Sequence, residues 1–164
     1  MNGKEIDEIL EKYADPTGQT LSILEDVQAK EKYLSQDVLS LVAEKTGLPV
    51  AKLYSVATFY SFFNLQPVGI NIISVCMGTA CHVKGAPYVF EALQDLLGLE
   101  GEGMTENRKF ILTTKDKCCT LTQARCFGAC SMAPVISINE KIYGYVNVRK
   151  LPEILREYGW HEKK

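Results

Sequence analysis

Four cysteines occur as two closely spaced pairs, and thiolates at such spacing can hold a metal centre. In the first pair Cys76 and Cys81 enclose MGTA, and in the second Cys126 and Cys130 enclose FGA. Each pair follows a predicted strand and lies in a loop of Gly, Ala, Thr and Ser. Four soft thiolates that converge from two loops can bind zinc or an iron–sulfur cluster. The spacing of the pairs leaves both metal centres open.

Three features favour the iron–sulfur cluster. With 46% hydrophobic residues, the chain can bury a core and does not need zinc in order to fold. Small residues in both loops let backbone N–H groups approach the sulfides of an anionic cluster. Pro87 begins a predicted helix just after the first loop, so the positive end of that helix can face the cluster. A disulfide and plain buried thiols are the remaining alternatives.

Composition excludes several classes of protein. A net charge of −2 over 164 residues, with no basic stripe, argues against binding to nucleic acid. The N-terminal segment MNGKEIDEILEKYADP is charged and amphipathic, so we expect no signal peptide. The longest apolar runs are too short for insertion into a membrane. We therefore expect a cytoplasmic protein, whose cysteines serve as metal ligands or redox groups more often than as disulfides.

Apolar residues at helical spacing predict four helices in the first 63 residues. The segment DPTG ends the first helix, and Ser35 and Gly47 are the expected caps of the third. Pro49 opens the fourth, over 50–63, whose many aromatic residues are expected mainly in the core, with a partner-facing surface as the alternative. The apolar stripes of the first three helices are Ile6, Ile9, Leu10 and Tyr13; Leu21, Ile23, Leu24 and Val27; and Val38, Leu39, Leu41 and Val42.

The pattern changes at NLQPVG (64–69), and strands are predicted beyond it. INIISV (70–75) is apolar and β-branched, which is typical of a buried strand. A helix is expected from Pro87 to Gly98. Four further strands are predicted at KFILTT (109–114), CTLTQA (119–124), PVISIN (134–139) and KIYGYV (141–146). The last two form a hairpin around Glu140 and Lys141. A final helix is predicted at RKLPEILREYG (149–159). The expected order is β-α-β-β-β-β-α.

Three segments together resemble the small thioredoxin-like 2Fe–2S subunit family: LYSVATFYSFFNLQPVG, CMGTACHVKGA and ARCFGACSMAPVISINEKIYG. This family includes the peripheral-arm small subunit of complex I and the gamma-type subunits of NAD-linked hydrogenases and formate dehydrogenases. The resemblance implies an α+β fold, with an N-terminal helical bundle for assembly at 1–66 and a thioredoxin-like 2Fe–2S domain at 67–164. It also implies that one 2Fe–2S cluster is bound by Cys76, Cys81, Cys126 and Cys130.

Cys118 and Cys119 depart from the family pattern, which has an ordinary strand beginning at this point. We expect a small buried thiol at Cys119 and a half-exposed thiol at Cys118, with a ligand or redox role as the alternative. A disulfide between adjacent cysteines would need a distorted peptide. Other residues near the ligands have either a role at the cluster or none beyond solvation and packing: His82, Lys84, Arg125, Met77 and Met132.

Four thiolates leave a cluster no free position for a substrate, and no other motif in the sequence supplies catalysis. We therefore expect an electron carrier that is not a complete enzyme. The resemblance implies docking beside a flavin- and NAD(H)-binding iron–sulfur subunit that holds FMN and NAD(H). CHVKGA and ARCFGAC resemble the hydrogenase-type members more than the respiratory ones. The expected complex is an NAD(P)-dependent (bifurcating) hydrogenase, and respiratory NADH:quinone oxidoreductase and NAD-dependent formate dehydrogenase are the alternatives. A zinc-stabilised interaction module is a remote alternative, and a thiol–disulfide enzyme would need C-x-x-C where this chain has C-x4-C.

Overall fold

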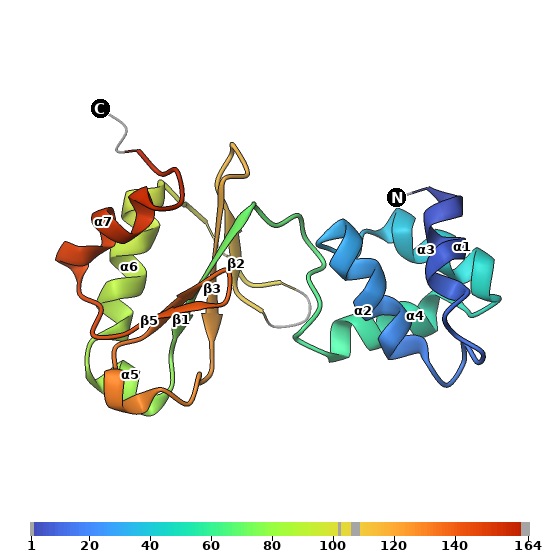
Figure 1. Ribbon diagram of the computed structural model, residues 1–164, viewed down its shortest axis with the longest axis horizontal. Coiled ribbons are helices and arrows are strands. Elements are labelled where there is room, and N and C mark those ends of the chain that lie inside the picture. The colour runs from blue at the N-terminus through green and yellow to red at the C-terminus, as the bar shows by residue number, and fades with distance from the viewer. Residues whose placement is uncertain (1, 102, 106–108, 162–164) are drawn as a thin grey trace. The chain divides into compact units, whose positions relative to one another are not determined.

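The computed structural model describes residues 2–101, 103–105 and 109–161. The chain divides into two compact units, each with its own hydrophobic core. Residues up to Pro67, joined by Thr105, form a helical unit, and the other described residues from Val68 onward form a unit built around a sheet (Figure 1). No helix in the described ranges is long and apolar enough to cross a membrane.

The helical unit contains the four helices that the apolar spacing predicts. They are α1 (Gly3–Leu10), α2 (Thr20–Glu31), α3 (Gln36–Thr46) and α4 (Val50–Phe59). Burying one apolar face of each helix removes that face from water, and this stabilises helices too short to persist alone. The fully or nearly fully buried residues include Ile6, Ile9, Ile23, Leu24, Val27, Leu39, Val42, Leu53 and Phe63.

Local capping fixes the ends of two of these helices. Asn2 and Glu5 form a capping box at the start of α1, where the Asn2 side chain accepts from the Glu5 N–H at 3.1 Å. Ser35 caps α3 as predicted, because its Oγ accepts from the N–H of Val38 at 3.2 Å. Gly47 ends α3 at a φ of 70°, a conformation that favours glycine.

Helix α4 ends earlier than the sequence predicts. The expected helix over 50–63 stops at Phe59, and Tyr60 already has an extended backbone. The side chain of Gln28 fixes the turn that follows: its Nε2 donates to the carbonyl of Phe62 at 3.3 Å. The aromatic residues were expected in the core or on a partner-facing surface, and both places are occupied. Phe63 is fully buried in the core, while Phe62 and Phe59 are 60% and 78% exposed.

The second unit is built around a five-stranded sheet of order β2-β3-β1-β4-β5. Only β1 and β3 run parallel; the other neighbours are antiparallel. The strands are β1 (Asn71–Cys76), β2 (Ile111–Thr113), β3 (Cys119–Ala124), β4 (Ile136–Ile138) and β5 (Lys141–Tyr143), and the helices are α5 (Thr79–Val83), α6 (Ala86–Leu97) and α7 (Leu151–Arg156), with 3-10 turns at Cys130–Met132 and Val148–Lys150.

Helices α6 and α7 cover the same face of this sheet (Figure 1). Ile73 of β1 and Leu121 of β3 are adjacent in register and fully buried beneath them. The indole N–H of Trp160, just beyond α7, donates to the Leu96 carbonyl of α6 at 3.1 Å. Alternation along the central strands therefore places their apolar side chains against the two helices.

The opposite face of β3 carries threonines. Thr120 Oγ1 accepts from the Gly69 N–H at 2.6 Å and lies 2.8 Å from Thr113 Oγ1, so its hydroxyl is fully used. Thr122, two residues along the same face, is 4% exposed. Among the described residues its Oγ1 has no hydrogen-bond partner. One strand face thus holds a satisfied and an unsatisfied buried hydroxyl.

The hairpin of the second unit differs from the sequence-based prediction in its turn and in its second strand. The hairpin turns at Asn139 and Glu140, one residue earlier than predicted, and both residues have positive φ values of 48° and 73°. Asparagine tolerates this conformation well, which favours it at the first turn position. The strand expected over 141–146 stops at Tyr143, because the next residues turn to pack against the loop that holds Met132.

Candidate metal centre

The parallel pairing of β1 with β3 brings the two cysteine loops together. Cys76 is the last residue of β1 and lies opposite Ala124, the last residue of β3. Because parallel strands end at the same edge of a sheet, the segments that follow them leave side by side. The first contact is a backbone hydrogen bond from Met77 N–H to the Ala124 carbonyl at 2.8 Å.

Gly78 lies where the two loops approach closely. A Cβ at this position would be 2.7 Å from the carbonyl oxygen of Arg125 and 3.6 Å from the Sγ of Cys126. A contact of 2.7 Å is closer than real Cβ atoms tolerate, so only glycine fits without moving a loop. In the sequence alone this glycine is only one of several small loop residues.

The first pair of thiols is buried. Cys76 and Cys81 are each 2% exposed. Cys81 lies on α5, a short helix that the sequence did not predict, within the segment that was expected to be a loop. One helical turn folds its side chain back toward the end of β1, and this places it beside Cys76.

The second pair of thiols lies at the surface. The Sγ atoms of Cys126 and Cys130 are 4.0 Å apart, and both residues are exposed. The Gly128 N–H donates to Cys126 Sγ at 3.3 Å, while Gly128 itself has a φ of 79°. A positive φ lets the backbone turn its N–H toward the sulfur, and glycine adopts it without a steric penalty.

The thiols influence one another's ionisation. Burial raises the pKa of Cys76, but hydrogen bonds from the Gly78 backbone, Cys81 and the Phe127 backbone outweigh it and lower this pKa overall. Burial, and then the Cys76 thiol, raises the pKa of Cys81. The hydrogen bond with the neighbouring Cys126 thiol raises the pKa of Cys130. Where thiols lie close together, hydrogen bonds from the neighbours lower the pKa of one thiol, and its negative charge raises the pKa of the others.

The donor set fits a 2Fe–2S cluster. All four thiols are free. In the part of the chain that the structure describes, no three Cys, His, Asp or Glu side chains are grouped closely enough to bind a single metal ion. The Cys76 thiol contacts both Cys81 and Cys126, so the two pairs meet, and a 2Fe–2S cluster takes two thiolates on each iron. The backbone N–H of Gly128 supplies the kind of hydrogen bond that stabilises charge on ligating sulfur.

Cys118 and Cys119 lie apart from this centre. They precede and begin β3, whereas Cys126 follows its other end. Cys119 is buried and Cys118 half-buried, as predicted, with Sγ atoms 3.7 Å apart. Burial, then the neighbouring Cys118 thiol, raises the pKa of Cys119 to about 12.

The remaining residues singled out from the sequence lie on the segments around the centre. His82, Lys84 and Arg125 are exposed, Met77 packs partly against the core, and Met132 is 36% exposed. Gly144 was not singled out. A Cβ there would lie 2.6 Å from the Cβ of Met132, so this glycine lets the segment after β5 support the Cys130 turn. A glycine after an alternating strand is the only sequence signal that could have indicated it.

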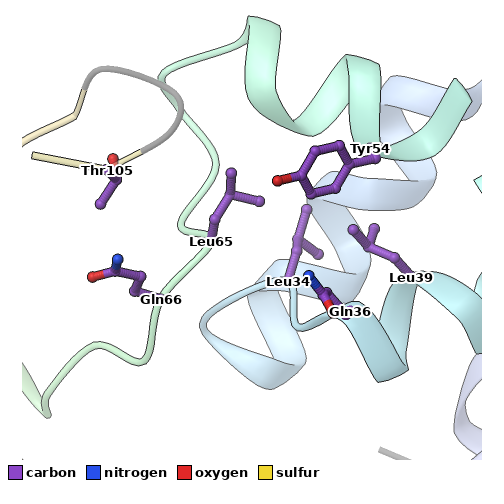
Figure 2. Close-up of a pocket in the computed structure, with 7 residues that line it drawn as sticks. All are labelled: Leu34, Gln36, Leu39, Tyr54, Leu65, Gln66 and Thr105. Atoms are coloured by element: carbon purple, nitrogen blue, oxygen red, sulfur yellow. The ribbon is translucent and has the colours of Figure 1, made fainter. Parts of the chain in front are cut away.

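The helical unit has a pocket of a different character. Figure 2 shows Leu34 and Leu39 on one side of it, Leu65 on the other, and the ring of Tyr54 above. Its polar lining comes from the amides of Gln36 and Gln66 and from Thr105, and no thiol, imidazole or carboxylate lines it. This pocket therefore offers no typical metal ligand, whereas the four cysteines of the candidate metal centre lie in the sheet unit.

Comparison with known proteins gives a family match over most of the chain. A family model described as thioredoxin-like 2Fe-2S ferredoxin matches residues 6–159. The NADP-reducing hydrogenase subunit HndA of Solidesulfovibrio fructosivorans is 35% identical over 155 residues, which cover 94% of this chain and 85% of that protein. A subunit of the NADH-quinone oxidoreductase of Rickettsia bellii (strain RML369-C) is 32% identical over 153 residues, covering 91% and 86%.

A solved structure supports the fold. A chain in the crystal structure of an NAD+-reducing NiFe-hydrogenase in the air-oxidized state superimposes with a TM-score of 0.60 and 17% identity. The match covers 75% of this chain but only 20% of that one. At this identity the likeness concerns the fold alone.

Proposed function

The chain belongs to the thioredoxin-like 2Fe-2S ferredoxin family, and on that premise we propose that it carries one 2Fe–2S cluster. The family implies the cluster, and the four free thiols in two pairs support the assignment of its ligands. The single observation that carries the proposal is the approach of the two loops at Gly78, which brings Cys126 Sγ to the loop that begins at Cys76. The proposed ligands are Cys76, Cys81, Cys126 and Cys130.

We further propose that the protein works as an electron carrier. A bound 2Fe–2S cluster supplies transfer of one electron at a time. The chain's own residues set where electrons enter and leave: Cys76 and Cys81 are buried, whereas Cys126 and Cys130 reach the surface. The Gly128 N–H stabilises negative charge on Cys126 Sγ. With four thiolates as ligands, no position is left for a substrate.

The proposed setting is a multi-subunit NAD(P)-linked oxidoreductase. The names of two relatives support this, since one is a subunit of an NADP-reducing hydrogenase and the other of NADH-quinone oxidoreductase. In this setting the chain exchanges electrons with a flavin- and NAD(H)-binding subunit, which holds FMN. An electron-bifurcating hydrogenase is the finer proposal, and a complex I-like enzyme or an NAD-dependent formate dehydrogenase is the alternative.

The helical unit is proposed to serve assembly. It contributes none of the four proposed ligands, yet it exposes aromatic side chains at the end of α4 and just beyond it. The rings of Phe59 and Tyr60 meet edge to face, with centroids 4.9 Å apart, and Phe62, two residues further along the chain, is also exposed. Exposed aromatic residues in a contiguous group are typical of a protein–protein contact.

Cysteine replacement tests the ligand assignment. Protein purified anaerobically is expected to contain about two irons and about two sulfides per chain and to show a 2Fe–2S absorption spectrum. Changing Cys126 to Ser should alter or abolish this spectrum, because serine is a harder ligand. The matched control is Cys119→Ser, at a thiol at the far end of β3, which should leave it intact. The reverse result would show the assignment to be wrong.

Reduction by pyridine nucleotides tests the carrier role. NADH gives up two electrons together as hydride, and a flavin must divide them before a one-electron centre can accept them. The loaded protein should therefore stay oxidised with NADH alone and bleach with dithionite. Rapid bleaching by NADH in flavin-free protein would contradict the proposal.

A further inference from the structure

Three segments of the sheet unit carry positive charge and contain no carboxylate of their own. Residues 76–90, 124–135 and 144–152 include the two cysteine loops and the segment after β5. They contain no Asp or Glu, although the chain as a whole has a net charge of −2. Their cations are Lys84, Arg125, Arg149 and Lys150, all exposed.

These three segments form one continuous surface, which we call the basic face. The Tyr145 N–H donates to the Met132 carbonyl at 2.6 Å, and the Val146 N–H donates to the Pro134 carbonyl at 3.1 Å. The close approach of Gly78 to the Arg125 carbonyl joins the first segment to the second. Figure 1 shows α5 and the turn at 130–132 at the same end of the sheet.

The four cations are available to a partner. None of them forms an ion pair with another described residue. Lys150 Nζ donates to the carbonyl of Tyr145 at 3.3 Å and to no carboxylate of the described residues. By contrast, Lys141 on β5 is held by Glu157 at 2.9 Å. The cations of the basic face are therefore not neutralised within the described chain.

Apolar side chains lie exposed among these cations. Val83 is 80% exposed, Tyr88 71%, Tyr145 60% and Val148 47%. Apolar side chains of this kind become buried when a partner protein covers them, and the charged residues then form the rim of the interface. The exposed ligand pair, with Cys126 next to Arg125, belongs to the same surface.

We propose that the basic face docks the acidic surface that surrounds the redox centre of a partner protein. This inference rests on the proposed function, since it needs an electron-carrying centre behind Cys126 and Cys130. Complementary charge speeds encounter and fixes orientation, so cations around exposed apolar residues suit a contact through which electrons pass. The rest of the chain is more acidic than the overall charge of −2, so its net charge is opposite in sign to that of the basic face and disfavours such a partner.

Ionic strength tests the sign of the charge near the centre. The dithionite-reduced, loaded protein is mixed in a stopped-flow instrument with ferricyanide, and one electron passes to each ferricyanide ion to give ferrocyanide. A reduced cluster with its thiolates carries about −3, so the four cations leave a local charge of about +1. The rate should then fall about fivefold between ~10 mM and ~200 mM ionic strength. The cation hexaammineruthenium(III) should show no such fall.

Charge variants locate the effect. Changing Lys84, Arg125, Arg149 and Lys150 together to Gln should reverse the ferricyanide dependence, so that the rate rises with salt. The double variant with Lys84→Gln and Arg125→Gln should lie between the two. The matched control removes four exposed lysines elsewhere, giving the same net charge, and should keep the fivefold fall; it changes Lys4, Lys32, Lys115 and Lys117 to Gln.

An acidic polypeptide then probes docking by a macromolecule. At low salt, poly-L-glutamate should slow the reaction of the unaltered protein with ferricyanide and have no effect on the fourfold variant of the basic face. A ferricyanide rate that rises with salt in the loaded, unaltered protein, or no effect of poly-L-glutamate on it, overturns the docking inference. Protein that lacks a 2Fe–2S spectrum contradicts the proposed function instead.

Discussion

Gly78→Ala is a direct test of how closely the two cysteine loops approach. Gly78 has a φ of −61° and a ψ of 156°, which alanine adopts without strain, so the change adds only a methyl group. That methyl would lie 2.7 Å from the Arg125 carbonyl oxygen, a backbone atom that moves only if its loop moves. The loops must part by several tenths of an ångström, and overpacking of this kind costs about 1–3 kcal/mol.

Two measurements follow the effect. Urea unfolding gives the loss of free energy of unfolding, and visible circular dichroism with EPR of the reduced protein reports the geometry around the cluster. We expect Gly78→Ala to lose about 1–3 kcal/mol and to shift both spectra, because Cys126 moves with Arg125.

The matched control is Gly98→Ala at the end of α6. Its φ of 61° makes alanine strained by about 1 kcal/mol, but a Cβ there meets nothing within 4 Å. The control should lose similar stability while both spectra stay unchanged. Unchanged stability and spectra in Gly78→Ala would refute the close approach of the loops, and with it the geometric basis of the ligand set.

Three other predictions concern positions outside the loops. Thr120→Val should cost about 1–3 kcal/mol because it removes the acceptor of a buried N–H, whereas Thr122→Val should be neutral or stabilise by about 1 kcal/mol; equal losses in urea unfolding would contradict this. Burial, then the adjacent thiol, raises the pKa of Cys119 to about 12, so its neutral form favours the folded state and stability falls as pH rises from 9.0 toward 12. Cys119→Ala should flatten this fall in pH-dependent unfolding, and an unchanged slope would argue against it. Changing Phe59 and Phe62 to Ser should leave the 2Fe–2S spectrum intact but weaken binding to a purified flavin-bearing partner at least about tenfold, as measured by calorimetry; equal affinity would remove the aromatic surface from the proposed assembly role.

Elements with strong local signals were predictable from the sequence. Ser35 and Gly47 bound α3 because a side-chain cap and a left-handed glycine act within a few residues. The strand at 119–124 matches β3, since β-branched residues mark it locally. Such signals need no knowledge of distant residues.

Elements that depend on distant contacts were not predictable. Helix α4 stops at Phe59, just before a turn that the side chain of Gln28 holds. Gln28 lies 34 residues before Phe62, the residue whose carbonyl it contacts. The short helix α5 has no apolar periodicity of its own, and it exists where Cys81 folds back toward Cys76. Hydrophobic period and capping do not carry this information.

The sequence by itself determined the chemistry of the centre, because residue type and spacing decide which donors a loop offers: two thiol pairs, C-x4-C and C-x3-C, with small residues between them. Only the tertiary structure decided that the pairs meet, that one is buried and the other exposed, and that exposed cations lie on the segments around them. The physical reason is the parallel pairing of β1 with β3, which joins segments far apart in the chain at one sheet edge. Burial and surface charge are properties of that edge, and no single segment contains them.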